Sequence, residues 1–304
     1  MPWIRTFITY CAFPLNFFGA QALALWWMGL GWSQGNIIAI LSVGTAVLLI
    51  GLERIHPFYP EWNQSRQDIG TDSLHLVISQ ILLPKYGEMA LHLLWIGVAA
   101  WLTEKMGGTL WPSHWHLYAQ LGLALVLGQF FEYWAHRGMH EVPLLWRLHA
   151  THHSPGRLYW LNAARFHPLD TSISLIVSLT PIILLGASAD VVTLMGVWVA
   201  VHGLYQHCNV HLRLGPLNYI FSMAELHRWH HSPVVEEANH NYGGNLIIWD
   251  VVFGTRWLPP DRESPAKIGM DSLPHFPMGF VDQMVSPLRW KKVVEESTAA
   301  KPAE

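Results

Sequence analysis

The chain is poor in charged residues and in cysteine. Only 13% of its 304 residues are Asp, Glu, Lys or Arg, about half the share of an ordinary soluble protein. Its formal net charge of −3 gives no reason to expect a nucleic-acid partner. The two cysteines, Cys11 and Cys208, are too few for a disulfide framework or a four-thiolate metal site. These shortages argue against a soluble, nucleic-acid-binding or disulfide-stabilised protein.

Apolar residues make up 51% of the chain and occur in long runs. A membrane-spanning helix needs roughly 20 mostly apolar residues. Runs that approach or reach this length lie at 12–30, 36–55, 86–102, 116–135, 172–187 and 190–206. Residues 73–83 are apolar but end at Pro84 and are too short to span, so they predict an interfacial or re-entrant helix. We therefore expect an all-α polytopic membrane bundle of about six spans, forming one domain over residues 1–304.

Lysine and arginine are distributed unevenly between the two ends of these predicted spans. The loops at 32–35 (WSQG) and 186–190 (GASAD) carry none, whereas Arg5, Arg54, Arg66 and the segments 137–165 and 213–304 carry most of them. Basic residues favour the cytoplasmic side. The pattern predicts an integral protein of a bacterial inner membrane, with both termini in the cytoplasm. Residues 290–304 are expected to form a flexible polar tail.

Histidine is the residue in excess. Thirteen of the 19 histidines fall between His136 and His240. The stretch RLHATHHSP at 147–155 returns as ELHRWHHSP at 225–233, and two pairs with three intervening residues, HRGMH and HCNVH, lie nearby. Spacings of three and four residues place side chains on one helix face. So many imidazoles would repel one another as cations, and neutral imidazole is a common metal ligand. The clusters predict a metal site in a cytoplasmic helical cap.

The number of histidines also bears on how many ions are bound. One zinc ion typically takes three or four protein ligands and an octahedral ion takes six, so eight to ten imidazoles favour two ions. Imidazole suits zinc, iron, copper and nickel alike. A soluble di-iron bundle would use mostly glutamates, a pattern that this chain does not have. From the residues alone, the identity of the metal stays open.

Two classes of membrane protein that bind metals through histidine are alternatives. A membrane zinc hydrolase needs one metal with three ligands and a nearby general base, and it would leave most of these histidines unused. A metal-binding transport protein or a membrane haem protein should carry its histidines deep within spans. Here only His92 and His202 are expected to lie deep within predicted spans.

The succession HRGMH, HATHH and HRWHH on a polytopic chain resembles the fatty acid hydroxylase/sterol desaturase superfamily of membrane di-iron enzymes. The resemblance covers about Gln129 to Trp257. It includes RFHPLD at 165–170 and NYGGNLIIWDVVFGT at 241–255. Among the members, it is similar to alkylglycerol monooxygenase-like and bacterial sterol-desaturase-like proteins.

The resemblance implies two iron ions and O₂-dependent hydroxylation of a lipid C–H bond, with desaturation as the alternative. The substrate would be a fatty acyl, alkyl-ether or sterol-like lipid. The candidate metal ligands are His136, His140, His149, His152, His153, His167, His207, His211, His227, His230 and His231. Beside them, Asp170 is expected to orient a ligand imidazole or contact the metals, and Asn209 to donate a hydrogen bond near His207.

Such a reaction consumes two external electrons in each turnover. The chain has no Gly-x-Gly-x-x-Gly nucleotide fingerprint and too few cysteines for an iron–sulfur cluster. We therefore expect a separate electron donor, either a ferredoxin or cytochrome with its reductase, or a reduced pterin.

Overall fold

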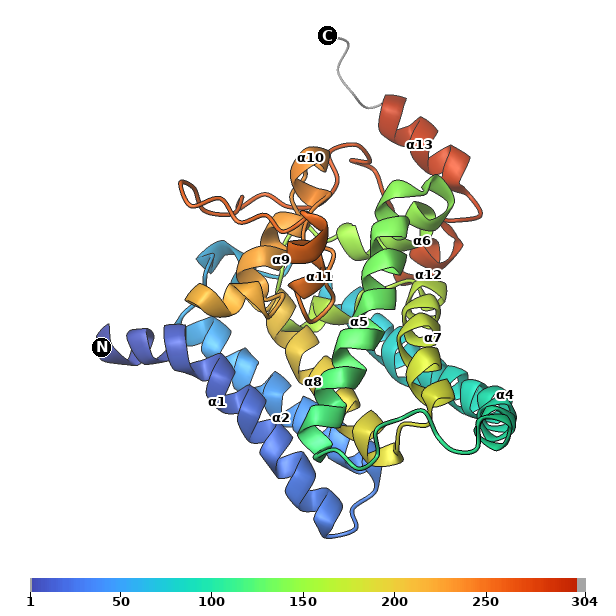
Figure 1. The fold of residues 1–304 in the computed structure, drawn as a ribbon. Coiled ribbons are helices and arrows are strands. Elements are labelled where there is room, and N and C mark those ends of the chain that lie inside the picture. The colour runs from blue at the N-terminus through green and yellow to red at the C-terminus, as the bar shows by residue number, and fades with distance from the viewer. Residues whose placement is uncertain (1, 300–304) are drawn as a thin grey trace.

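The computed structural model describes residues 2–299, which contain helices and no β-strand (Figure 1). Six long helices are α1 (Pro2–Gly29), α2 (Gln34–Ile55), α4 (Leu83–Met106), α5 (Leu117–Glu141), α7 (Pro168–Leu185) and α8 (Ala189–His207). The shorter ones are η1 (Pro60–Asn63), α3 (Ile69–Leu74), η2 (His75–Leu82), α6 (Pro143–His153), η3 (Trp160–Ala164), η4 (Gly215–Tyr219), α9 (Ala224–His230), α10 (Val235–Ala238), α11 (Ile248–Phe253), α12 (Phe280–Val285) and α13 (Trp290–Ala299). The all-α prediction is confirmed.

Each of the six predicted spans coincides with one of the six long helices. Three of them, α1, α2 and α7, are long and apolar enough to cross a membrane. Large apolar side chains of these helices are exposed on the surface: Trp26 is 60% exposed and Val47 is 64% exposed. Such exposure is unfavourable in water and expected in lipid. These features are those of a membrane helical protein, and the count of six spans stays a prediction.

The two ends of the helix bundle differ: one carries turns between long helices, and the other carries most of the short helices. In Figure 1 the α1–α2 turn, the start of α5 and the α7–α8 turn lie at the bottom, while α6 and α9 to α13 gather at the top. Buried apolar residues of α1, α2, α5 and α8, such as Phe17, Leu49, Leu125 and Val197, form the main core. The packing brings the C-terminal ends of α5 and α8 up against α6 and α9, and these four segments carry the histidine motifs.

Residues 73–83, predicted as an interfacial or re-entrant helix, belong to a continuous succession of α3, η2 and α4, and their place in the membrane stays a prediction. His75 in this stretch is buried, with Nδ1 3.0 Å from the Phe166 carbonyl oxygen and Nε2 2.8 Å from Gln283 Oε1. Residues Trp290–Ala299 form helix α13, in which Val293 and Trp290 join an apolar cluster with Ala150, and the flexibility of 290–304 stays a prediction. Residues 300–304 lie outside the described residues.

Gly128 lets α5 and α7 approach closely. A Cβ atom there would lie 3.0 Å from the Ser178 carbonyl oxygen and 2.9 Å from Met195 Cε. We expect Gly128→Ala to lower the free energy of unfolding by about 1–3 kcal/mol, because the backbone of α7 must shift. Gly122→Ala on the same helix is the matched control, as its Cβ would meet nothing within 4 Å. Thermal unfolding in one detergent would measure both, and equal midpoints would contradict the close contact.

Candidate metal centre

Nine of the predicted histidines form two groups whose ligand nitrogens can meet around a point. The first histidine group consists of His136, His140, His149, His153 and His230. The second consists of His152, His207, His227 and His231. Within each group the ligand atoms all lie within 4.8 Å of one another. Two metal sites side by side are therefore available, one from each group.

The repeated triplet is divided between the two groups. In the first copy, His149 and His153 face the first group, whereas His152 faces the second. In the second copy, His230 belongs to the first group, and His227 and His231 to the second. The reason is helical geometry, because neighbouring residues point about 100° apart around a helix axis. Each copy therefore forms part of both sites.

The facing nitrogens of the groups are close. In the first group, His136 Nε2 lies 3.0 Å from His149 Nε2 and 3.1 Å from His230 Nε2. In the second, His231 Nε2 lies 3.1 Å from His152 Nε2 and 3.0 Å from His227 Nε2. Two imidazole nitrogens bound at right angles to one ion, at about 2.1 Å each, would stand about 3.0 Å apart. The spacing thus fits a shared ion in each group.

The opposite ring nitrogens determine the proton positions. Nδ1 of His136 donates to the Tyr242 carbonyl at 2.5 Å, and Nδ1 of His230 donates to the His240 carbonyl at 2.8 Å. A carbonyl oxygen only accepts hydrogen bonds, so the ring proton must sit on Nδ1. In a neutral ring this leaves a lone pair on Nε2. Lone pairs that face each other at 3 Å repel, and a cation between them removes the repulsion.

Burial keeps these imidazoles neutral. The pKa values of His149, His153 and His230 lie well below the usual 6.5, chiefly because burial disfavours the charged ring and also because neighbouring imidazoles repel its charge. The same causes lower the pKa values of His152, His227 and His231. Nε2 of His140 and of His153 is buried without a hydrogen-bond partner among the described residues. Neutral, unpartnered nitrogens of this kind suit a divalent metal.

The two groups differ in access. All four histidines of the second group are buried, whereas His136 and His140 of the first group are partly exposed. A cavity of about 240 Å³ is lined by His140, His153, Trp146 and Asn239, among others. The first group is therefore the one that a small molecule can reach from this cavity.

Two predicted ligands lie outside both groups. His167 precedes α7, where its Nδ1 accepts a hydrogen bond from the Leu169 amide at 3.2 Å. The centroid of the His211 ring lies 5.2 Å from the centroid of the His56 ring and 5.3 Å from that of the Phe58 ring. Both histidines make local contacts in the structure, and neither joins the nine converging imidazoles.

The two predicted catalytic residues have different surroundings. Asp170 is buried, and its Oδ2 accepts a hydrogen bond from His149 Nδ1 at 2.8 Å, so it holds a ring of the first group in place. Asn209 instead joins the backbone of Tyr59, donating to its carbonyl at 2.8 Å and accepting from its amide at 2.9 Å. His207 Nδ1 bonds to Asn162 Oδ1 at 3.0 Å, a partner that the sequence reasoning missed.

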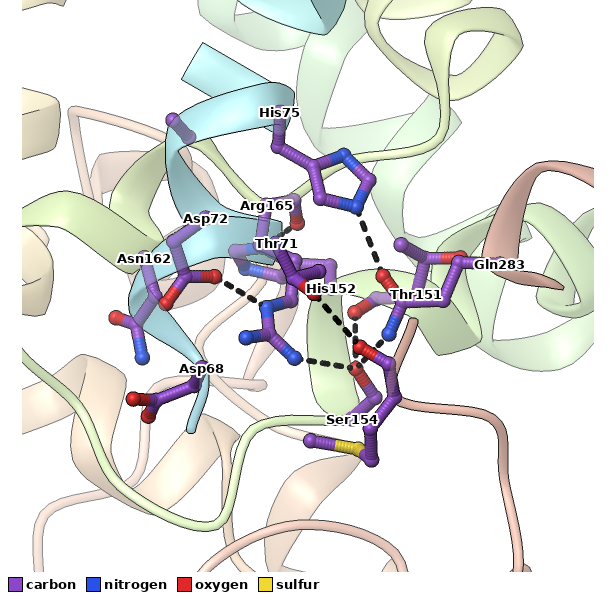
Figure 2. A network of polar contacts seen from close by, with 12 residues as sticks. Asp68, Thr71, Asp72, His75, Thr151, His152, Ser154, Asn162, Arg165 and Gln283 are labelled. Carbon is purple, nitrogen blue, oxygen red and sulfur yellow. Dashed lines mark hydrogen bonds and ion pairs between the residues drawn. The ribbon is translucent and has the colours of Figure 1, made fainter. Parts of the chain in front are cut away.

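A buried polar network supports the second group from outside (Figure 2). Asp72 of α3 faces the Arg165 guanidinium, with Oδ1 2.5 Å from Nε, and it also accepts a hydrogen bond from the Tyr159 hydroxyl at 2.6 Å. The Arg165 carbonyl in turn accepts from His152 Nδ1 at 3.3 Å. Asn162, in the same segment, bonds to His207. The segment from Arg157 to Arg165 thus connects α3 with two rings of the second group.

Comparison with known proteins places the chain among lipid-modifying enzymes. The protein-family profile described as fatty acid hydroxylase matches residues 121–255, which hold all nine converging histidines. The ornithine lipid hydroxylase OlsE of Rhizobium tropici is 36% identical over 266 residues, covering 87% of this chain and 79% of that protein.

Other relatives share a shorter region. Human alkylglycerol monooxygenase is 33% identical over 156 residues, which cover 51% of this chain and 34% of that enzyme. A putative Δ7-sterol-C5(6)-desaturase of Arabidopsis thaliana is 31% identical over 166 residues, which cover 51% of this chain and 54% of that protein. No solved structure matches the chain significantly.

Proposed function

The chain belongs to the fatty acid hydroxylase family, and from this membership and its two histidine groups we propose that it is a membrane di-iron oxygenase that hydroxylates a lipid. The observation that carries the proposal is the convergence of ring nitrogens in two adjacent groups. In the first group the Tyr242 and His240 carbonyls accept from Nδ1 of His136 and His230, which leaves the Nε2 lone pairs of these two rings facing each other. The nine grouped histidines are the proposed ligands.

Two ferrous ions held there would supply the reduction of O₂ and the oxidation of a C–H bond. The chain's own residues do the rest. Asp170 and the Tyr242 carbonyl fix the rings of His149 and His136 so that their Nε2 atoms point inward. Burial of the second group excludes water from one side of the centre, and the partly exposed first group is left for the substrate.

We propose a lipid with an amino-acid head, such as an ornithine lipid, as the substrate, because OlsE is named for that activity and aligns over most of both chains. Desaturation of a lipid on the same site is the second candidate, favoured by the likeness to the plant sterol desaturase. A zinc hydrolase with three ligands would leave most of the nine imidazoles without a role, and a metal transporter would carry its histidines deep within its spans. A separate electron donor, a ferredoxin or cytochrome with its reductase or a reduced pterin, completes the reaction.

Expression in a bacterium that makes ornithine lipids tests the proposal. Under ¹⁸O₂ we expect lipid extracts to contain a product that carries one labelled oxygen, and anaerobically purified protein to bind about two irons per chain. An unlabelled product that has lost two hydrogens would establish the desaturase instead. A single zinc with no oxygen-dependent product would overturn both redox functions.

We also propose that the histidine-rich end and both termini face the cytoplasm of a bacterial inner membrane, from the lysine and arginine distribution. Ala189 at the start of α8 and Glu236 in α10 are both exposed, and they lie at opposite ends of the bundle. With Cys11 and Cys208 replaced by serine, an impermeant maleimide added outside should label Ala189→Cys and not Glu236→Cys. The reverse labelling would overturn the orientation.

A further inference from the structure

Arg228 is a buried arginine that forms no ion pair with any of the described residues. Its side chain is buried, and Nε and Nη1 have no hydrogen-bond partner among the described residues. The buried Arg157 and Arg165 are each paired with an aspartate, at 2.6 and 2.5 Å. The guanidinium of Arg228 instead lies over the ring of Phe58, 3.7 Å from its centroid. A guanidinium is not deprotonated in proteins, so Arg228 is a cation at neutral pH.

The unpaired guanidinium lines a cavity of about 450 Å³. Its walls include Phe58, Trp229 and the loop from Leu258 to Ser264, which give it an apolar body beside the charge. This cavity is separate from the one that reaches the first histidine group, since the two share no lining residue. Helical geometry agrees with this, because Arg228 stands two residues before His230 and therefore points about 160° away from that ring of the first group around the axis of α9.

Among the described residues no carboxylate around the cavity forms an ion pair with Arg228, although the negative charge of Glu225 lies close enough to stabilise the guanidinium. Glu225 Oε2 accepts hydrogen bonds from the Leu214 amide at 2.7 Å and from Asn218 Nδ2 at 2.8 Å. Glu263 pairs with Arg213 at 3.3 Å, and Asp261 is exposed at the rim. A buried cation left without a partner is costly, and a fork of N–H donors matches a carboxylate or phosphate group.

We propose that this cavity binds an oxyanion, a phosphate or carboxylate group carried by a membrane lipid, with Arg228 as its principal partner. The position supports a lipid source. Arg213 on the cavity wall donates its backbone amide to the Thr9 carbonyl of α1 at 3.0 Å, and Phe58 follows the end of α2. Both helices are apolar enough to span the membrane, so the cavity lies near the level of the lipid headgroups. The proposal does not rest on the hydroxylase function.

Thermal unfolding of the full-length protein in detergent tests the site, because a ligand that binds only the folded state raises the midpoint. The probes are dihexanoyl phosphatidylglycerol, inorganic phosphate and the uncharged dihexanoyl glycerol. We expect a saturable rise with the phospholipid and none with the uncharged glyceride. Arg228→Gln should weaken the apparent affinity about tenfold or more, as expected for loss of charge-assisted hydrogen bonds.

Arg289→Gln, which removes an exposed arginine outside the cavity, should keep the full shift. Leu258→Trp is a second variant, which narrows the cavity and leaves Arg228 in place, and it should also weaken binding. A shift of equal size and midpoint with inorganic phosphate would identify a free oxyanion as the source. A shift that Arg228→Gln and Leu258→Trp both leave unchanged, or an equal rise with dihexanoyl glycerol, would overturn the site.

Discussion

Alanine in place of either His152 or His230 is expected to abolish oxygenation and to remove one metal per chain. The two residues occupy corresponding places in the repeated triplet, but His230 belongs to the first histidine group and His152 to the second. An alanine leaves one coordination position open and also empties space beside the remaining rings. We expect more than about 100-fold loss of turnover in each variant, since even residues that only orient a ligand change affinity or activity 10- to 100-fold.

The double variant distinguishes the effect on turnover from the effect on metal content. If both metals are needed for one reaction, turnover in the double variant should be no lower than in either single variant, because residues that act as a unit are not additive. Metal content should instead fall stepwise, from about two to one to none, because the two groups are distinct. Iron analysis and ¹⁸O incorporation on the same preparations would measure both.

His275→Ala is the control, since His275 is exposed and lies outside both groups. It should keep the metal content and the turnover of the parent. Full metal with full turnover in both His152→Ala and His230→Ala would mean that the repeated triplet is a recurrence of local structure only. Losses of turnover that multiply in the double variant would mean that the two groups serve independent sites.

The histidine pattern was informative because its spacing is local. Residues four apart share a helix face, so His149 with His153, and His227 with His231, could be paired from the sequence. The three-residue pairs His149/His152 and His227/His230 are instead divided between the two groups. The same periodicity separates His152 from His153, since adjacent residues diverge around the helix. The number of histidines predicted two ions, and the two groups of the structure agree with that number.

Contacts between distant segments could not be predicted in this way. Asn162 reaches His207 across 45 positions in the sequence, and Asp72 reaches Arg165 across 93. Neither residue belongs to a motif with a characteristic spacing. His211 had the right spacing from His207, but the chain leaves α8 at His207, so the two rings no longer share a helix face. The tail was predicted from its polarity alone, and the structure adds that Val293 and Trp290 of α13 join an apolar cluster with Ala150, Leu273 and Phe276.

The Asp72→Asn variant is expected to lose the metal of the second histidine group and to keep the metal of the first. Asp72 and Arg165 are both fully buried, and breaking such a pair leaves an uncompensated charge that costs about 3–5 kcal/mol. Relief of that charge requires the segment around Arg165 to move. The Arg165 carbonyl and Asn162 in this segment orient His152 and His207. No ring of the first group bonds to it among the described residues.

Metal content distinguishes this positioning role from a general loss of stability. We expect Asp72→Asn to bind about one iron per chain and Asp271→Asn to bind two, because Asp271 pairs with Lys267 on the surface and such pairs contribute under about 1 kcal/mol. Adding Arg165→Met to Asp72→Asn removes the stranded charge and leaves the Arg165 backbone carbonyl in place. Stability and the second metal should then recover together. Loss of both metals in equal measure, or full metal in Asp72→Asn, would show that the ion pair does not act through His152 and His207.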